Sequence, residues 1–484
     1  MRFLGPLPAH DLTYSDVFLV PTRSAVTSRL DVDLAPGDGS GATIPIVSAN
    51  MNSVTGPRLA ATLARRGGLG VLPQDLPLQD LGEAIRWVKQ QPVAWDAPIV
   101  LSPEQTVAEA LRQLPPTEGH GIVLRSASGE ELGAVSATRL GTALPDARLG
   151  DLVHGSITAF DADDLGSGGL DAPRAAFDLL VAAGIDFALV QRHGHVIGTV
   201  SRRSALRGTL YRPALDDAGR LRVAAAVGIN GDVASKASAL AKEGVDVLVL
   251  DTAHGHQEGM LRALAAVKKL GLGIPIVAGN IVTAEGVRDL VDAGADILKV
   301  GVGPGAMCTT RMMTAVGRPQ FGAVLETAEA ARELGAHVWA DGGVRYPRDV
   351  ALALAAGAAS VMIGSWFAGT IEAPGVLETD DAGRLYKQSW GMASTKAVHE
   401  RFGRLDPYEL ARKELFAEGI SSSKIYLDPL RPSLEDLLDM ITSGVRSSFT
   451  YAGAADLAAF QERAVVGFQS AAGYEEGKAL PVSW

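Results

Sequence analysis

The chain has very little cysteine: Cys308 is the only one among 484 residues, so no disulfide can form within it. Proteins without disulfides are typical of reducing compartments, and we expect a cytoplasmic protein. The sequence also lacks a run of about 18 apolar residues and an apolar core of the kind that signal peptides have. We therefore expect no association with a membrane.

Basic residues are in the minority. The sequence has 44 Lys and Arg against 55 Asp and Glu, which gives a formal net charge of −11. A chain with this charge is poorly suited to the phosphate backbone of nucleic acid, so we expect no nucleic-acid partner. A small phosphorylated ligand is compatible with the charge, because glycine-rich loops and helix N-termini bind anions through backbone N–H groups.

Short apolar runs alternate with amphipathic helical segments over most of the chain. The predicted strands are Ile44–Ala49, Gly68–Leu72, Leu221–Val227, Val247–Leu250, Ile274–Ala278, Ala295–Val300, Val338–Ala340 and Ser360–Ile363. Nearly continuous apolar runs joined by helices favour a parallel sheet that is buried on both faces. Eight such units predict an α/β protein with a closed (β/α)8 barrel, a TIM barrel. A doubly wound open sheet is the alternative, but no GxGxxG follows the first strand.

The alternation breaks between residues 92 and 211, where two similar segments occur. LGAVSATRL at residues 132–140 is similar to IGTVSRRSAL at residues 197–206, and a helix is predicted before each of them. An inserted pair of β-α-β repeats on an exposed barrel loop fits this pattern. We therefore assign residues 1–91 and 212–484 to the barrel and residues 92–211 to an insert. A polar segment of about residues 385–451 is predicted to be an active-site flap.

The most distinctive stretch is KVGVGPGAMCTTR, residues 299–311, which holds the cysteine. Three alternating glycines and Pro304 predict a loop whose backbone approaches a ligand closely. Thr309 and Thr310 place hydroxyl groups beside the Cys308 thiol at the start of a helix, where a thiol can become an activated nucleophile. A small buried core residue is the alternative interpretation of Cys308.

Polar residues and glycines follow the other predicted strands, at the end where a barrel carries its active site. They include Ser48, Met51, Asp251, Thr252, Asn280, Asp341, Gly343, Gly364 and Ser365. Backbone N–H groups of the last three are candidates for a phosphate, because phosphate sites recur after the final two strands of this fold. Asp341 is suited to a ribose diol, and tight turns are the alternative role for the glycines. His254 and His256 form an HxH pair, which lacks the further ligands of a metal site.

These motifs resemble those of the IMP dehydrogenase/GMP reductase family over nearly the full length. They are LTYSDVFLVP at residues 12–21, DTAHGH, AGN, GVGPGAMCTTR, ADGGVR, WGMAS, AEGISS and GVRSSFTYAGA. The resemblance implies that Cys308 bonds to purine C2 of GMP or IMP, and that Thr310 and Glu418 handle the proton. It implies substrate contacts from Ser48, Met51, Asn280, Asp341, Gly343, Gly364, Ser365, Gly391 and Met392. The implied nicotinamide site is at Asp251, Thr252 and Ala253.

Two activities share this family's scaffold, and we favour the GMP reductase activity, which converts GMP to IMP and ammonia with NADPH. The flap sequence RFGRLDPYELARKELFAEG lacks the adjacent Arg-Tyr pair of the dehydrogenases. SANMNSV and RSSFTYAGA also resemble reductase sequences more closely. An IMP dehydrogenase that uses NAD is the alternative, favoured by the insert and by DTAHGH. A non-catalytic nucleotide sensor is a remote third interpretation.

The resemblance implies further ligands and partners. The insert at residues 92–211 resembles the family's tandem CBS (Bateman) module, which implies a regulatory purine nucleotide, ATP or GTP. Main-chain oxygens of Gly301, Gly303 and Cys308 resemble a site for a monovalent cation, K⁺. Ala306 stands where the family usually has a serine near the phosphate. Family members assemble from identical subunits, and we expect a homotetramer or a homo-octamer.

Overall fold

The computed structural model describes residues 1–153, 157–166, 171–391, 394–396, 399, 405–415 and 423–479. Eight parallel strands close into a barrel, in the order β11, β12, β13, β14, β15, β16, β3 and β4. Their bounds are β3 Ile46–Ser48, β4 Leu69–Leu72, β11 Ala224–Gly228, β12 Val247–Asp251, β13 Ile276–Ile281, β14 Ile297–Val300, β15 His337–Asp341 and β16 Ser360–Ile363. Each predicted strand contributes one of them, so the predicted (β/α)8 barrel is confirmed.

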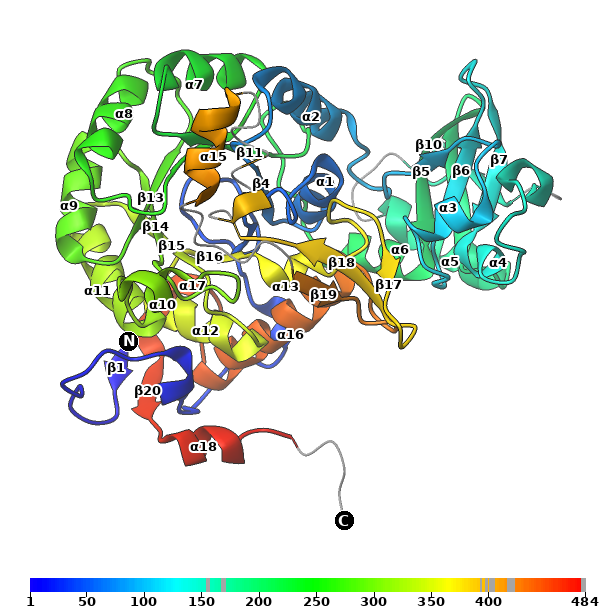
Figure 1. Ribbon diagram of the computed structural model, residues 1–484. Coiled ribbons are helices and arrows are strands. Elements are labelled where there is room, and N and C mark those ends of the chain that lie inside the picture. Colours follow the sequence, from blue (N-terminus) through cyan, green and yellow to red (C-terminus); the bar gives the residue numbers. More distant parts are fainter. Residues whose placement is uncertain are drawn as a thin grey trace.

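Helices form a ring around these strands (Figure 1). They are α1 Pro57–Arg65, α2 Leu78–Gln90, α7 Val233–Lys242, α8 Glu258–Lys268, α9 Ala284–Ala293, α11 Gln320–Glu333, α12 Pro347–Ala355 and α16 Leu434–Ala452. The last of them, α16, packs against both α12 and α1 and so closes the ring. The predicted flap of about residues 385–451 is therefore too long at its C-terminal end. Leu438, Ile441, Val445 and Phe449 recur at helical spacing and are buried in the barrel's main core.

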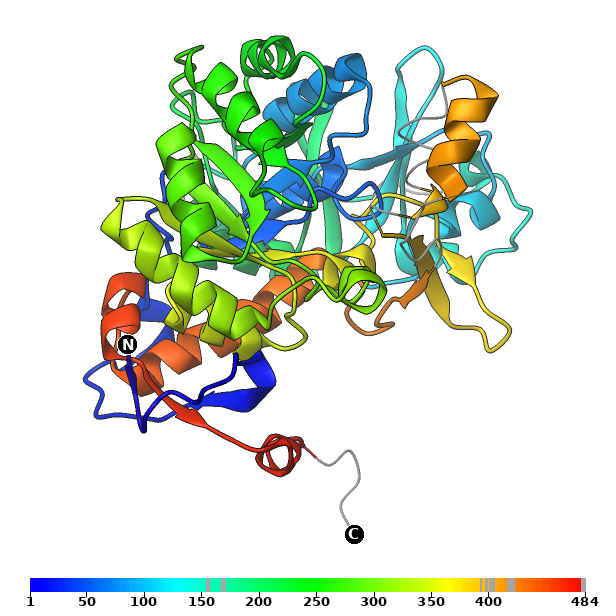
Figure 2. The same cartoon turned by 60° about the vertical axis from the view of Figure 1, so that its left-hand side comes forward.

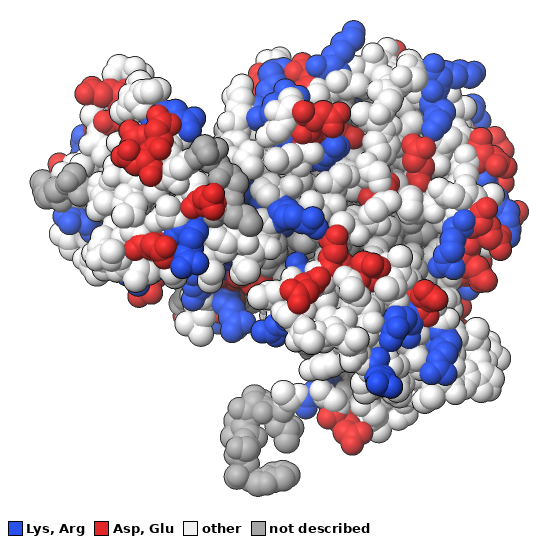
Figure 3. Space-filling model, turned by 180° about the vertical axis from the view of Figure 1, so that it is seen from behind, with Lys and Arg blue, Asp and Glu red and all other residues white. Residues whose placement is uncertain are grey.

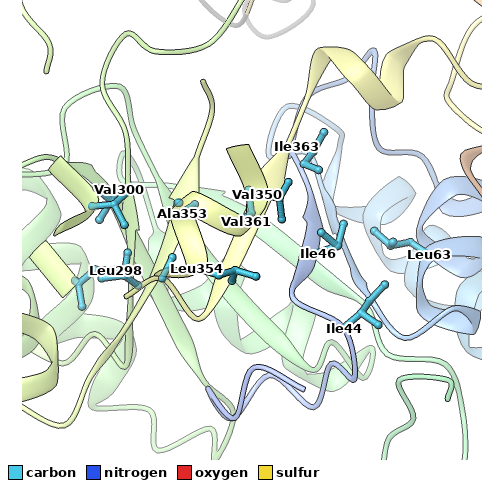
Figure 4. Close-up of a cluster of buried hydrophobic side chains, with 14 of the residues drawn as sticks. Ile44, Ile46, Leu63, Leu298, Val300, Val350, Ala353, Leu354, Val361 and Ile363 are labelled. Atoms are coloured by element: carbon cyan, nitrogen blue, oxygen red, sulfur yellow. The ribbon is translucent and has the colours of Figure 1, made fainter. Parts of the chain in front are cut away.

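Successive residues of each barrel strand point alternately into the barrel and out toward the helices. On β14, Ile297 belongs to the interior cluster together with Trp339 of β15. Leu298 and Val300 belong to the layer between strands and helices (Figure 4). This alternation places Lys299 on the inward side of β14, one layer above Ile297. A lysine inside an apolar barrel needs opposite charges around it.

The insert folds into two small sheets beside the barrel (Figure 1). The first holds β5 Ile99–Leu101, β6 Gly121–Arg125 and β7 Glu131–Ser136; the second holds β8 Ala159–Asp161, β9 Phe187–Arg192 and β10 His195–Ser201. In each sheet the first two strands are parallel and the last two antiparallel. Helices α4 Ala137–Leu140 and α6 Arg202–Leu210 follow the two sheets. The two segments that are similar in sequence therefore occupy equivalent places in two structural repeats.

A buried group of ions joins the insert to the barrel. Arg66, next to the end of α1, donates to Glu435 of α16 at 2.6 Å, and Arg207 of α6 donates to the other oxygen of Glu435 at 3.1 Å. Arg207 also donates to Asp436 at 2.6 Å. Burial alone would raise the pKa of Glu435, but Arg66 and Arg207 outweigh it and lower this pKa to about 2.

Replacing Glu435 by glutamine is expected to lower the free energy of unfolding by about 3 kcal/mol, because buried guanidinium groups then lose an opposing charge. The measurement is denaturant unfolding, with Glu333→Gln on the exposed face of α11 as the matched control. In the wild-type protein this stabilisation is complete above the ordinary pKa of 4.5 and is lost as the pH falls toward 2. Equal stability of the two variants would show that the ion group does not hold the insert in place.

The outer surface carries charges of both signs. On the face shown in Figure 3, acidic and basic side chains are interspersed, and no broad basic region covers that face. Figure 2 shows that α18, Ala471–Glu476, stands away from the barrel on the side of the N-terminus. Across the part of the chain that the structure describes, none of the helices combines the length and the apolar character that crossing a bilayer requires.

Candidate active site

The loop after β14 carries Cys308 to the mouth of the barrel. Residues 301–309 connect β14 to the short helix α10, Thr310–Thr314. The Cys308 side chain is exposed, which excludes the alternative of a buried core cysteine. Its Sγ lies 3.2 Å from Oγ1 of Thr310, and its backbone N–H donates to the carbonyl of Gly305 at 3.0 Å. A thiol and a hydroxyl are thus held side by side, as the sequence predicts.

This loop packs closely against the end of β15. A Cβ atom at Gly301, where φ is +153°, would lie 2.1 Å from the carbonyl oxygen of Asp341. Glycine is therefore the residue that allows the two backbones to approach. Gln320 of α11 ties the same two segments together, because its Nε2 donates to the carbonyls of Val300 at 2.8 Å and Asp341 at 3.2 Å.

A cavity of about 240 Å³ opens beside Cys308. The predicted site residues on its wall are Met51, Ala253, Asn280, Gly301, Gly303, Cys308, Thr310, Asp341, Gly343, Gly364, Ser365 and Gly391. They come from the ends of six barrel strands and from the segment around Gly391, yet they surround one space. The prediction that the strand ends build a common site is therefore consistent with the geometry.

Some predicted site residues lie elsewhere. Ser48 is buried, and its hydroxyl pairs with that of Thr55 at 2.8 Å, so it braces the strand end beneath the cavity wall. Asp251 sits behind the wall and accepts from Nδ2 of Asn50 at 2.9 Å. Thr252 exchanges backbone hydrogen bonds with residues 279 and 280. Met392 and Glu418 lie outside the described residues.

Lys299 is the centre of the polar group below the cavity, although it was not among the predicted site residues. Its Nζ lies 2.8 Å from Oδ1 of Asp251 and 2.7 Å from Oδ2 of Asp341. It also donates to Oδ1 of Asn280. Asn280 in turn donates to Asp341 at 3.1 Å and to the carbonyl of Gly301 at 2.6 Å. One buried ammonium group therefore holds three side chains from three neighbouring strands.

The charge balance explains why Lys299 stays protonated at 3% exposure. Burial lowers the pKa of Lys299, but the two carboxylates outweigh burial and raise it above the ordinary lysine value. The sequence carried a signal for this role, because a lysine inside an apolar strand and two residues after an inward Ile297 must point into the barrel. No sequence signal identified the partners of Lys299, since they come from other strands.

Two residues that were not among the predicted site residues, Arg345 and Trp366, also line the cavity. His256 of the HxH pair lies 2.7 Å from Asp289. Within the described residues, no group of three or more His, Cys, Asp or Glu side chains is arranged to hold a metal ion.

Comparisons with known proteins agree with the fold. The family model described as "IMP dehydrogenase / GMP reductase domain" matches residues 11–479. Proteins named GMP reductase from Mycobacterium bovis and Mycobacterium tuberculosis are 55% identical over 486 residues, covering 100% of this chain and of each relative. The inosine-5'-monophosphate dehydrogenase of Aquifex aeolicus is 36% identical and covers 96% of this chain and 94% of its own.

A solved structure is similar over the whole chain as well. It is the crystal structure of a cysteine-to-alanine variant of GMP reductase from Trypanosoma brucei in complex with guanosine 5'-monophosphate. Its TM-score is 0.68 at 30% identity, and the match covers 99% of both chains. The resemblance predicted from the motifs is thus confirmed, and the chain belongs to the IMP dehydrogenase/GMP reductase family.

Proposed function

We propose that the protein is a GMP reductase, which converts GMP to IMP and ammonia with a reduced nicotinamide cofactor, NADPH. The observation that carries this proposal is the exposed Cys308 thiol, 3.2 Å from the Thr310 hydroxyl, on the wall of the barrel-mouth cavity. The 55% identity to proteins named GMP reductase over the full length supports the reductase activity over other activities of the family.

The cavity suits a purine nucleotide bound in one orientation. Backbone N–H groups of Gly343, Gly364 and Ser365 are the donors proposed for the phosphate. Asp341 accepts from the ribose hydroxyls, while Lys299 holds that carboxylate from behind. Met51 and Gly391 lie on the wall around the base, and Met392 next to Gly391 is proposed to contact it too. This arrangement brings purine C2 to the sulfur of Cys308.

The reaction proceeds through a covalent bond between Cys308 and C2. The thiolate adds to C2, and the exocyclic amino group leaves as ammonia once it has received a proton. Protonation of the leaving amine requires a positioned general acid. Thr310 and Glu418 deliver this proton to the amine. Addition of hydride to C2 then breaks the carbon–sulfur bond, which releases IMP and restores the thiolate.

The cofactor supplies this hydride when it is bound. Ala253 lies on the cavity wall, and Asp251 and Thr252 precede it at the end of β12. Ala253 borders the same space as Cys308, so this strand end fits a nicotinamide ring beside the purine. We propose NADPH as the cofactor of the reductase; NAD belongs to the alternative activity.

A monovalent cation, K⁺, is proposed for the main-chain oxygens of Gly301, Gly303 and Cys308. Carbonyl oxygens are donors that K⁺ accepts. The carbonyl oxygen of Gly301 also accepts a hydrogen bond from Nδ2 of Asn280 at 2.6 Å. This oxygen would therefore bind the cation and the Asn280 side chain together.

The insert is proposed to be a tandem CBS (Bateman) module that binds ATP or GTP as a regulator. The repeated sheet topology of its two halves supports this proposal. Calorimetric titration of the full-length protein with each nucleotide tests it.

We also propose that the protein forms a homotetramer or a homo-octamer in the cytoplasm. Light scattering of the purified protein measures the number of subunits.

The activity is tested by comparing two reactions. GMP with NADPH is expected to lose absorbance at the nicotinamide band and to release IMP and ammonia. IMP with NAD is expected to give no XMP, because the flap sequence lacks the Arg-Tyr pair of the dehydrogenases. Formation of XMP without reduction of GMP would instead favour an IMP dehydrogenase, which the 36% identity to the Aquifex aeolicus dehydrogenase keeps as the second candidate.

A further inference from the structure

Arg345 is the single basic side chain among the described residues that line the cavity. It follows β15 in the loop Gly342–Tyr346, two residues after Gly343. Asp341 is the single acidic side chain on the same described wall. The described part of the wall therefore has one charge of each sign, and the two lie four residues apart, at the end of β15 and in the loop that follows it.

The backbone of Arg345 is held firmly while its side chain stays exposed. Its N–H donates to Oδ2 of Asp349 at 2.8 Å, and the N–H of Tyr346 donates to the same oxygen at 3.1 Å. Asp349 is itself buried in the first turn of α12. These bonds fix where the side chain starts without using its guanidinium group.

The guanidinium group has no ion-pair partner among the residues that the structure describes. Other arginines of this region differ. Arg348, three residues later, donates to the carbonyl of Tyr14 at 3.1 Å and pairs with Asp349 at 3.3 Å. Arg318 pairs with Asp11 at 2.8 Å and Glu326 at 2.7 Å. Arg345 therefore has no ion pair or side-chain hydrogen bond to the described residues, although its charge also acts on the nearby carboxylate of Asp349. Its guanidinium group lies at the edge of a cavity that we assign to a nucleotide.

We propose that Arg345 binds the phosphate of the nucleotide and sets the preference for a nucleoside monophosphate over a nucleoside. This inference rests on the proposed function. A phosphate monoester carries about 1.5 to 2 negative charges at neutral pH. Gly343, Gly364 and Ser365 offer it neutral donors, and Ala306 offers no hydroxyl. A guanidinium group supplies the missing charge and forms two parallel hydrogen bonds with phosphate oxygens.

The test compares GMP with guanosine in three variants of the full-length protein. Arg345→Met is expected to weaken GMP binding by about 10- to 100-fold in calorimetry, the loss typical of a hydrogen bond to a charged group. KM for GMP rises by a similar factor while kcat changes little, because the phosphate is far from C2. Guanosine binding and KM for NADPH stay unchanged. Arg345→Lys restores part of the GMP affinity, since it keeps the charge and loses the two-pronged geometry.

Arg262→Met on the exposed face of α8 is the matched control and is expected to bind GMP like the wild type. GMP affinity of Arg345→Met equal to that of the control would overturn the inference. So would an equal loss of guanosine affinity, or a rise confined to KM for NADPH, which would assign the charge to the cofactor. Because calorimetry measures binding without turnover, a protein that binds GMP through Arg345 and does not reduce it would refute the proposed function alone.

Discussion

Cys308→Ala is expected to reduce turnover of GMP by about 10⁴-fold or more, the scale seen when a covalent nucleophile is removed. The sulfur forms the bond that activates C2, and no other described residue on the cavity wall carries a thiol. Binding of GMP is expected to persist, because phosphate and ribose contacts come from other loops. In line with this, the Trypanosoma brucei relative was crystallised as a cysteine-to-alanine variant with GMP bound.

The measurement pairs steady-state rates with calorimetry of GMP binding. Mass spectrometry of the wild-type protein mixed with GMP alone should detect a covalent adduct, which the variant should lack. The exposed position of Cys308 means that the substitution leaves no internal cavity, so the melting temperature should stay near that of the wild type. Undiminished turnover by the variant would refute the covalent mechanism.

Lys299→Met is expected to lower both activity and stability, activity by about 10²-fold or more and the free energy of unfolding by about 3 to 5 kcal/mol. It leaves the carboxylates of Asp251 and Asp341 close together at the barrel interior without their shared cation. Repulsion between the two carboxylates then displaces them, and Asp341 loses the geometry needed for the ribose.

Lys299 acts through other residues, so its test needs a readout beyond rate. KM for GMP should rise by a larger factor than kcat falls in Lys299→Met, because a displaced Asp341 weakens binding of the ribose. The double variant Lys299→Met with Asp251→Asn should regain part of the stability, since it removes one unpaired charge. Lys269→Met, exposed just after α8, is the matched control. A variant with wild-type stability and an unchanged KM for GMP would contradict this role.

The pattern of local sequence was sufficient for the barrel and for the catalytic loop. Apolar runs such as Val247–Leu250 and Ser360–Ile363 specify strands because each is too short for a helix and is bounded by turns. Gly301, Gly303 and Pro304 specify a tight loop by their own backbone preferences. The position of α16 was recoverable in principle, since its apolar residues recur at helical spacing, although the polar surroundings of the flap led to a wrong prediction there.

What the tertiary structure alone decided is which of these residues meet. Pairing of neighbouring barrel strands brings Asp251 of β12 and Asp341 of β15 around the ammonium group of Lys299 on β14, although 90 residues separate the two aspartates in the sequence. The fold also places Arg345 on the wall of the cavity of Cys308 and Arg207 of the insert against Glu435 of the barrel. Local preferences determine the strands, turns and reactive side chains of this protein by themselves. Pairing between distant charges depends on the packing of strands and helices, because burial together requires those charges to neutralise one another.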